Sequence, residues 1–543
     1  MKKVIKVMWG ILLPMMLYSQ YQWAKIYEGG GNEGHICVQQ TMDGGYIVAT
    51  GYSDVLVIKL NSLGEIEWAK TYGEPPNYEA ANWIQQTSDG GYILTGWCYG
   101  THGNPPTPEY SNILILKLNS TGEISWAKIY GQDDQETSDF IYQTSDGGYI
   151  VTGKTDGGPG YYDIIVMKLD SNGNVVWAKL YGGSYPEHDP CIIQTSDGGY
   201  IFTCETWSFG GWTSHFLVTK LDANGNVSWA KALGVSAYDD VPRCIKQTSD
   251  GGYIIAGRSK IYIQPYMEFD PVVMKINSNG EPAWAKRYEM QQYVQANDGA
   301  NFICPLYDGY VVAGSTEMGV YDSRTFLLKI TSDGNLTWGK IYNGIGSNGA
   351  SCLYIPTNGY IIGGTVYDSI EQRTDIYILK TNSEGIVLSP QGDTCEGFEY
   401  SIPVISASFY TNTSVQVTVT SYSPTVSTAT QLVTTSVTPA VYTECEPVGI
   451  EEVCNCKKGY LSEIEITPSI GKKFKIKYSL LKNTRVKIEL YDKAGKIVKK
   501  IFEGEKGKGI HYFVFDAKNL VPGKYFCIVK TNFWMKKRSI LVK

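Results

Sequence analysis

The chain is poor in histidine, and this scarcity bears on metal chemistry. Five histidines occur in 543 residues. The four that precede residue 457 are His35, His102, His188 and His215. None of them has a neighbour at the short spacing that zinc sites use. Asp170–Asn174 begins like a calcium loop but lacks the later carboxylate, and a hairpin turn explains it. We therefore expect no metal site.

Arginine and phosphate-binding motifs are also scarce. The arginines before residue 457 are Arg243, Arg258, Arg287, Arg324 and Arg373. The net charge of −7 shows no excess of basic residues that would indicate nucleic-acid binding. The chain has no glycine-rich phosphate loop that opens a helix and no serine nucleophile elbow. We expect no cofactor and no nucleic-acid partner.

Long apolar runs are absent after the first residues. Lys2, Lys3 and Lys6 precede the short apolar run Val7–Tyr18. This pattern is typical of a secretory signal peptide, which we assign to residues 1–20, with cleavage near Ser19 or Gln20. No later stretch is long enough to span a bilayer. The sequence thus predicts an exported chain without a transmembrane segment in its mature form.

Two short strings recur along most of the chain. One is Asp-Gly-Gly-Tyr or a close relative, and it ends at Tyr46, Tyr92, Tyr149, Tyr200, Tyr253, Tyr310 and Tyr360. The other is Trp-Ala-Lys or Trp-Gly-Lys, and it starts at Trp23, Trp68, Trp126, Trp177, Trp229, Trp284 and Trp338. A degenerate eighth copy of the second string is Ile386-Val387-Leu388. Repeats at this period are typical of propellers.

Each repeat unit reads as four short strands. In one unit, strands over 191–195, 200–204, 216–221 and 227–232 alternate with a Ser-Asp-Gly-Gly turn, a loop and an Asn-Gly turn. The fold class is therefore all-β, with a seven-bladed β-propeller of four-stranded blades over residues 21–389. The last unit lacks a good fourth strand, so we expect Tyr21–Tyr27 to complete it and close the ring.

The segment Lys168–Gly183 resembles the repeats of bacterial secreted β-propeller proteins. This resemblance implies the fold and says almost nothing about function. The hairpin Thr331–Trp338 is similar to an Asp-box, which ties a hairpin together, with Asn335 where glycine is usual. Asp-box propellers include sialidases, whose chemistry requires a cluster of arginines. The unrelated repeat positions of the arginines in this chain argue against that activity.

The connections of the blades divide between two faces. The short Ser-Asp-Gly-Gly and Asn-Gly turns lie on one face, and the longer, variable loops lie on the other, which we call the long-loop face. Its loops are 98–111, 154–162, 205–215, 259–269, 73–81, 131–138, 185–189 and 290–300. Because rigid scaffolds carry function on variable loops, we place ligand binding there.

Aromatic residues concentrate in these long loops. The candidate ligand-binding residues are Trp97, Tyr99, Tyr161, Tyr162, Trp207, Trp212, Tyr262 and Tyr266. Exposed aromatic rings suit glycans, polymers or proteins. Binding is favoured over catalysis, and whether the chain is an enzyme stays open. No catalytic residue is assigned. A secreted carbohydrate-active hydrolase using the loop carboxylates Asp133/Asp134 or Asp239/Asp240 is one alternative, and a purely structural surface or adhesion protein is another.

The cysteines fall into two groups. Cys37, Cys191, Cys244 and Cys352 share one repeat position, which Trp83 or Phe140 fills in other blades, so we expect buried free thiols too far apart to bridge. The other group is Cys395, Cys445, Cys454 and Cys456, whose disulfide pairing stays open.

Two segments follow the repeats. Residues 390–456 are rich in Ser, Thr and Val and contain no Lys or Arg, and we read them as a linker or a small β segment. Residues 457–543 are basic and contain short alternating strands, which predict a small immunoglobulin-like β-sandwich.

Residues 457–543 resemble the type A C-terminal sorting domain of the type IX secretion system. The resemblance lies in 476–480, 486–492, 494–496, 509–511, 522–526 and 536–543, while Thr467-Pro468-Ser469 departs from the usual Asn-Pro. It implies that the secretion machinery is a partner, that the chain crosses the outer membrane, and that the protein is secreted or displayed at the cell surface. The ligand, the oligomeric state, and release against anchoring stay open.

Overall fold

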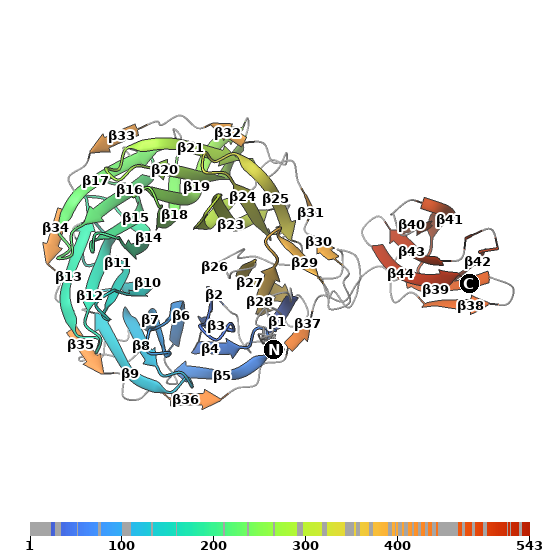
Figure 1. Cartoon of the computed structure of the whole chain (residues 1–543), viewed down its shortest axis with the longest axis horizontal. Coiled ribbons are helices and arrows are strands. Elements are labelled where there is room, and N and C mark those ends of the chain that lie inside the picture. Colours follow the sequence, from blue (N-terminus) through green and yellow to red (C-terminus); the bar gives the residue numbers. More distant parts are fainter. Residues whose placement is uncertain are drawn as a thin grey trace, which may run out of the picture.

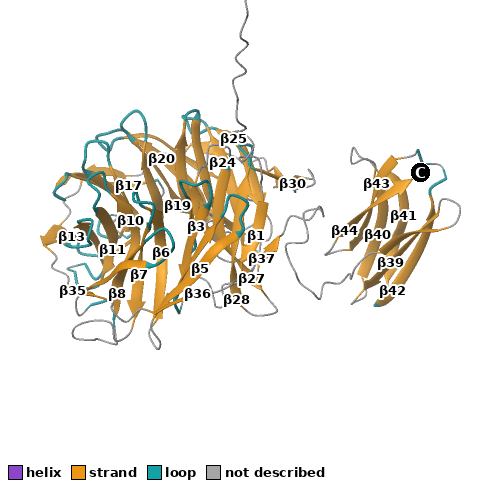
Figure 2. Cartoon of the chain, turned by 60° about the horizontal axis from the view of Figure 1, so that its bottom comes forward, coloured by secondary structure: helices purple, strands orange, loops and turns teal. Residues whose placement is uncertain are grey.

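The computed structural model shows a ring of blades followed by a separate β-sandwich (Figure 1). It describes residues 23–27, 34–51, 53–73, 78–99, 110–131, 134–158, 160–209, 212–235, 238–263, 266–289, 297–317, 323–342, 352–354, 359–368, 373–388, 394–396, 398–399, 404–406, 411–414, 418–421, 425–428, 433–436, 441–443, 465–469, 473–480, 484–491, 497–518, 520–521, 523–531 and 535–542. Every regular element in these ranges is a strand (Figure 2). The signal-peptide assignment lies outside them.

Seven blades of four antiparallel strands form the ring, which confirms the predicted all-β propeller. Blade 1 contains β2 (Cys37–Gln40), β3 (Tyr46–Gly51), β4 (Val55–Leu60) and β5 (Ile66–Gly73). Blade 2 contains β6 (Tyr78–Gln86), β7 (Tyr92–Tyr99), β8 (Ser111–Leu118) and β9 (Ile124–Gly131). Blade 3 contains β10 (Glu136–Gln143), β11 (Tyr149–Thr155), β12 (Asp163–Leu169) and β13 (Val175–Gly182), and blade 4 contains β14 (Glu187–Gln194), β15 (Tyr200–Thr206), β16 (His215–Leu221) and β17 (Val227–Gly234). Within each blade the first strand is innermost and the Trp-bearing strand outermost of the four.

Blades 5 to 7 repeat the pattern. Blade 5 contains β18 (Asp240–Gln247), β19 (Tyr253–Ile263), β20 (Tyr266–Ile276) and β21 (Pro282–Tyr288). Blade 6 contains β22 (Gly299–Leu306), β23 (Gly309–Glu317), β24 (Ser323–Ile330) and β25 (Leu336–Tyr342). Blade 7 contains β26 (Cys352–Tyr354), β27 (Tyr360–Asp368), β28 (Arg373–Thr381) and β1 (Trp23–Tyr27). Strand β1 pairs with β28 from Trp23↔Lys380 to Tyr27↔Ile376, and this pairing closes the ring. The degenerate copy β29 (Ile386–Leu388) pairs instead with β30 (Thr394–Glu396).

The Ser/Thr/Val-rich segment adds a fifth strand to the outside of each blade. These strands, which we call the outer belt, are β31 (Phe398–Glu399), β32 (Val404–Ser406), β33 (Thr411–Ser414), β34 (Thr418–Ser421), β35 (Thr425–Thr428), β36 (Val433–Ser436) and β37 (Val441–Thr443). They pair in turn with blades 6, 5, 4, 3, 2, 1 and 7, so the belt runs around the ring against the blade order (Figure 1). The belt strands form no sheet of their own.

The belt keeps one register with all seven blades. The lysine of each Trp-Ala-Lys or Trp-Gly-Lys string lies opposite a belt residue: Lys340↔Glu399, Lys286↔Ser406, Lys231↔Ser414, Lys179↔Ser421, Lys128↔Thr428, Lys70↔Ser436 and Lys25↔Thr443. These belt positions recur every seven or eight residues. The belt is thus a second, shorter repeat matched to the first, and it pairs the outer edges that unprotected strands would expose.

Neighbouring blades contact each other through the two strings found in the sequence. The indole of one blade packs on the tyrosine of the next, with ring centroids 5.7 to 6.4 Å apart. The pairs are Trp23–Tyr46, Trp68–Tyr92, Trp126–Tyr149, Trp177–Tyr200, Trp229–Tyr253, Trp284–Tyr310 and Trp338–Tyr360. In six blades a tyrosine four residues after the tryptophan donates to a glycine carbonyl of the next blade's hairpin, at 2.6 to 2.8 Å.

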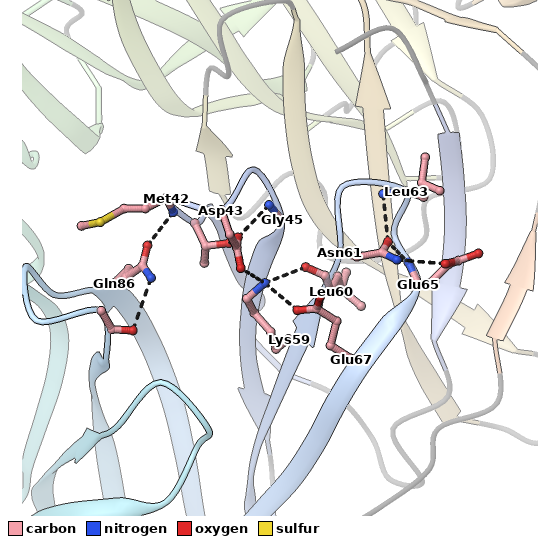
Figure 3. Close-up of polar contacts among 12 residues, drawn as sticks. Met42, Asp43, Gly45, Lys59, Leu60, Asn61, Leu63, Glu65, Glu67 and Gln86 are labelled. Carbon is pink, nitrogen blue, oxygen red and sulfur yellow. Dashed lines mark hydrogen bonds and ion pairs between the residues drawn. The ribbon is translucent and has the colours of Figure 1, made fainter. Parts of the chain in front are cut away.

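In six blades, a buried or half-buried lysine holds the turn between the first two strands. In blade 1, the Nζ of Lys59 lies 2.9 Å from Asp43 and 2.9 Å from Glu67, and Met42 N donates to Gln86 of the next blade (Figure 3). The same pair recurs as Lys117–Asp89, Lys168–Asp146, Lys220–Asp197, Lys275–Asp250 and Lys329–Asp308, at 2.6 to 3.0 Å. The turn aspartate therefore has an electrostatic role besides its conformational one.

The C-terminal residues form two antiparallel sheets that share no strand with the ring. One contains β38 (Glu465–Ser469), β39 (Lys473–Leu480) and β42 (Gly509–Asp516), and the other β40 (Thr484–Tyr491), β41 (Ile497–Lys506), β43 (Gly523–Thr531) and β44 (Met535–Val542). Both sheets contribute to one apolar core, with Ile476 from the first and Ile488 from the second. Within the described residues, no helix is long and apolar enough to cross a membrane.

The hairpin glycines permit a direct test of the contact between blades. Gly225 has φ +75°, and a Cβ built there would lie 2.8 Å from the Trp177 ring, whereas Gly198 has φ +83° and open space. Gly198→Ala should therefore cost only backbone strain, about 1 kcal/mol. Gly225→Ala should cost roughly 1–3 kcal/mol more, because Trp177 must move. Chemical denaturation of the full-length protein measures both free energies of unfolding. Equal losses would contradict the packing role of Gly225.

Candidate functional site

A cavity of about 720 Å³ lies where the innermost strands meet at the axis of the ring. Residues from all seven blades line it. Its wall includes Phe269, near the start of β20, and Glu317, at the end of β23, and both strand ends belong to the long-loop face. The cavity therefore lies at the end of the axis where we expected the functional surface.

Irregularities in the innermost strands place polar side chains in the wall. The pairing of each innermost strand with its neighbour skips one residue in four blades, at Asn82, Asp139, Arg243 and Asn301. In blade 4 it skips two, Asp189 and Pro190. All six residues line the cavity. Because a bulge turns a side chain out of the alternating pattern, one irregularity per blade supplies these polar groups.

Aromatic rings form an apolar part of the wall. Trp83 stacks on Phe302 with ring centroids 6.0 Å apart, and it packs on Phe140 at 4.7 Å. All three line the cavity. Each occupies the repeat position directly after a bulge. In blades 4 and 5 the same repeat position holds Cys191 and Cys244.

Cys37, Cys191 and Cys244 are buried free thiols, as the repeat position predicts. Two of them, Cys191 and Cys244, are unbridged as expected but lie closer together than their repeat spacing indicates. The sulfur atoms of Cys191 and Cys244 form a hydrogen bond between blades 4 and 5. Neighbouring innermost strands converge near the axis, and repeat spacing in the sequence carries no information about that convergence.

Asp189 is ionised and held in an unusual backbone conformation. Its φ is +53°, in the left-handed region that non-glycine residues seldom adopt. Burial alone would raise the pKa of Asp189, but the positive charges of Arg243, Lys154, His188 and Arg258 together outweigh it and hold the pKa below its usual value. The Nη1 of Arg243 lies 2.6 Å from Asp189 Oδ2. The strain is thus retained together with an ion pair in the cavity wall.

Asp139 is the opposite case. Burial, and then the negative charge of Asp189, raise the pKa of Asp139 to about 7. Its Oδ2 has no hydrogen-bond partner among the described residues. The two aspartates of neighbouring blades therefore differ in charge near neutral pH: Asp139 holds its proton for much of the time, and Asp189 does not.

The remaining charged groups surround this pair. The guanidinium of Arg258 lies 4.4 Å from the centre of the Phe269 ring, and its Nε has no hydrogen-bond partner in the part of the chain that the structure describes. Burial, and then Arg243, lower the pKa of His35, and burial raises the pKa of Glu205. The wall therefore combines cations, an anion, neutral polar groups and aromatic rings.

The predicted ligand-binding residues lie outside the cavity wall, along the long-loop side of blades 2 to 5. Tyr99 is 40% exposed, Tyr161 75%, Trp212 97% and Tyr262 50%. Trp97, Tyr162 and Trp207 are half-buried. Tyr266 is in β20, but its side chain lies outside the described set. Together the exposed rings make a discontinuous aromatic rim beside the cavity.

Tyr161 connects this rim to the cavity. Its φ is +81°, and Tyr161 and Asp189 are the two non-glycine residues with positive φ within the described ranges. The Tyr161 ring contacts Tyr162 at 5.8 Å, and Tyr162 contacts His188 at 5.2 Å. His188 precedes Asp189 in the chain. The contacts thus run from an exposed ring to the ionised carboxylate.

Of the carboxylate pairs considered for catalysis, Asp239/Asp240 has structural partners. Asp239 lies 2.9 Å from Lys260, and buried Asp240 accepts from Ser259 Oγ at 2.5 Å and from Val235 N at 2.8 Å. Asp133 lies outside the described residues. No group of three or more His, Cys, Asp or Glu side chains is placed to hold a metal ion in the described ranges.

The sequence-based candidates do not include the cavity residues, because those candidates come from the long loops and the cavity residues lie mostly in or beside the innermost strands. A usable signal was present: the residue before the buried repeat position is Ile36, Asn82, Asp139, Pro190, Arg243, Asn301 and Ser351 in successive blades. Variation at one position of an otherwise regular repeat indicates a surface that the fold does not require for packing.

No protein-family model and no curated protein matches the chain. Solved structures share the architecture at low similarity. A putative 6-phosphogluconolactonase from Bacteroides uniformis is 11% identical, with a TM-score of 0.37, over 71% of this chain and 100% of that one. A protein of unknown function from Bacteroides caccae is 13% identical, with a TM-score of 0.32, over 58% and 93%. An exo-1,5-alpha-L-arabinanase from a bovine ruminal metagenomic library is 10% identical, with a TM-score of 0.26, over 68% and 99%. These likenesses concern the fold and carry no argument about ligands.

The raised pKa of Asp139 predicts a pH dependence of stability. The unfolded carboxyl ionises near its usual pKa of 3.8, whereas the folded one retains its proton up to about 7. This contribution to stability is therefore present in full at low pH and is lost as the pH rises from about 4 to 7. Asp139→Asn cannot ionise and should lose less in that range. Melting temperatures of both proteins between pH 4 and 8 measure the difference, and parallel curves would refute the assignment.

Proposed function

We propose that the axial cavity and the aromatic rim bind a carbohydrate polymer at the long-loop face. The observation that carries the proposal is Tyr161, which combines a left-handed backbone with a 75% exposed ring. Apart from its edge contact with Tyr162, this exposed ring contributes little to packing, so a role in contacting a ligand accounts for its costly conformation. Aromatic faces bind the apolar faces of sugar rings, and the amides and charged groups of the wall suit their hydroxyl groups.

A second function, glycosidic-bond hydrolysis, is favoured by the contrast between Asp139 and Asp189. Hydrolysis requires one carboxyl that holds a proton and one that is ionised. Here Asp139 would donate its proton to the leaving oxygen. Asp189 would accept a proton from the water that attacks the anomeric carbon. Both line one cavity, whereas the loop carboxylates Asp239 and Asp240 have other partners.

Binding should be measured with the full-length protein on an array of neutral and acidic polysaccharides. Tyr161→Ala should weaken binding about tenfold, the effect of losing roughly 1.4 kcal/mol of ring contact. Tyr307→Ala is the matched control, because Tyr307 is fully exposed in the turn between β22 and β23, on the other face. Equal effects of the two substitutions would overturn the placement of the site.

The same samples should be assayed for new reducing ends. If the second function holds, Asp139→Asn and Asp189→Asn abolish turnover and leave binding measurable, and activity falls above pH 7 as Asp139 ionises. Binding without turnover in the wild type would leave a binding protein. The absence of both would leave a structural role at the cell surface.

For delivery, we propose that the C-terminal sandwich is an immunoglobulin-like sorting domain of the type IX secretion system. The support is its resemblance to that domain in sequence, together with a core of its own. The chain would enter the periplasm through its signal peptide and cross the outer membrane, to be secreted or displayed at the surface.

Deletion of residues 457–543 should strand the protein in the periplasm, because the secretion machinery then has no domain to recognise. Cell fractionation and surface proteolysis in a host with this system measure the distribution. Normal surface display of the truncated protein would refute the sorting assignment.

A further inference from the structure

Two buried carboxylates meet between blades 3 and 4, outside the axial cavity. Asp163 begins β12 and is 1% exposed, and Glu187 begins β14 and is fully buried. Each is the first residue of its strand, on the long-loop side of the ring. Two like charges in one buried place are unfavourable unless a proton or a cation compensates them.

Backbone geometry shows how close the oxygen atoms are. A Cβ built on Gly182 would lie 1.7 Å from Asp163 Oδ1 and 2.7 Å from Glu187 Oε2. A Cβ built on Gly160 would lie 2.9 Å from the carbonyl oxygen of Tyr185, 3.0 Å from that of Gly183 and 3.1 Å from Asp163 Oδ1. The Asp163 Oδ1 atom therefore borders the space beside Gly182 together with one carboxylate oxygen, and the space beside Gly160 together with two carbonyl oxygens.

The hydrogen bonds around the pair leave one of these atoms unsatisfied. Gly160 N donates to Asp163 Oδ2 at 3.0 Å, Thr206 Oγ1 donates to Glu187 Oε1 at 2.9 Å, and Gly183 N donates to Glu187 Oε2 at 3.3 Å. Asp163 Oδ1 has no partner within the described ranges, where neither carboxylate forms an ion pair with a basic side chain. An enclosed anionic oxygen without a donor is costly in an otherwise satisfied protein.

The neighbouring blade interface provides an internal comparison. Between blades 2 and 3, the position of Asp163 is occupied by Asn112 and that of Glu187 by Glu136. A Cβ on Gly131 would lie 1.8 Å from Asn112 Oδ1 and 3.1 Å from Glu136 Oε2, so the arrangement is the same with an amide in place of one carboxylate. Between blades 1 and 2 the position holds Asp54, which is half-buried and therefore open to solvent. A carboxylate at this position is thus not required by the fold.

We propose that Asp163 Oδ1, Glu187 Oε2 and the carbonyl oxygens of Gly183 and Tyr185 bind a calcium ion. Two carboxylates balance the charge of a divalent cation, and an all-oxygen set of carboxylates and carbonyls is the one that Ca²⁺ prefers, with water completing the shell. The proposal departs from the sequence-based expectation of no metal site, because no linear motif brings these four atoms together.

An ion at this position would also affect the conformation of two segments of the long-loop face. Tyr161 lies two residues before Asp163, and His188 and Asp189 directly follow Glu187. An ion bound to both carboxylates would hold the segments that present Tyr161 and Asp189. The site itself does not rest on the proposed carbohydrate function, so it can be tested alone.

The test is thermal unfolding of the full-length protein after treatment with EDTA, with added CaCl₂ or MgCl₂. Calcium at about 100 times its dissociation constant should raise the melting temperature by about 3 °C or more, because it binds the folded state alone. Magnesium should act more weakly, since its small octahedral shell fits carbonyl-rich sites poorly. No calcium response in the wild type would overturn the proposal and indicate that the two carboxyls share a proton.

Asp163→Asn is the decisive variant, because it copies the interface between blades 2 and 3 and should fold. It should lose the calcium response and be at least as stable as the wild type in EDTA. Glu187→Gln should lose the response as well. Asp146→Asn, which removes an exposed carboxylate from the same blade, should keep it. A calcium response that survives in Asp163→Asn would place the ion elsewhere and overturn the assignment.

Discussion

The contact of an indole with the tyrosine and the glycine hairpin of the next blade is the interaction on which the ring depends. It occurs at all seven blade interfaces, including the one where Trp23 of the N-terminal strand packs on Tyr46. Within a blade, strands pair with their sequence neighbours. Between blades, side chains make most of the contacts, with few backbone hydrogen bonds such as the one from Glu187 N to the Tyr162 carbonyl, so the angle between blades depends on how these rings pack. The two repeated strings are thus two halves of one interface, and for this reason they persist while the loops vary.

The architecture could be predicted because it depends on local turn residues and on regularly spaced motifs in the sequence. Turn glycines, alternating strands and the spacing of the Trp and Tyr strings together indicate seven four-stranded blades. The outer belt was missed for a physical reason. A fifth strand on an outer edge needs backbone pairing and hardly any apolar side chains, so its sequence lacks the buried apolar run that identifies a strand such as β12. The belt residues recur every seven or eight positions, but this spacing indicates strands only once each residue is seen to pair with a lysine of a blade, as Ser421 does with Lys179.

The candidate site was harder to predict than the fold. The exposed rings of Tyr161 and Trp212 follow from loop composition. The polar wall of the cavity does not, because it depends on where a bulge interrupts the alternation of an innermost strand. Asp139 and Arg243 occupy the same repeat position in blades 3 and 5, with Pro190 of blade 4 between them, and nothing in their local sequence shows that both reach the cavity. The difference in pKa between Asp139 and Asp189 likewise arises from burial and from Arg243, a residue 54 positions from Asp189.

The repeats of this ring differ from one another in two places, and polar and charged side chains are buried or half-buried there. At the axis, strand irregularities in five blades bring Asn82, Asp139, Asp189, Arg243 and Asn301 into the wall, which is therefore chemically varied. At the interfaces on the long-loop side, the first residues of β12 and β14 meet, and the choice between Asn and Asp there changes the net charge of a buried site by one unit. Both places lie at the long-loop end of the blades, because the opposite end is occupied by the Lys–Asp pairs that hold the short turns. The same pairs that make one face uniform therefore leave the other face as the one where the repeats can vary.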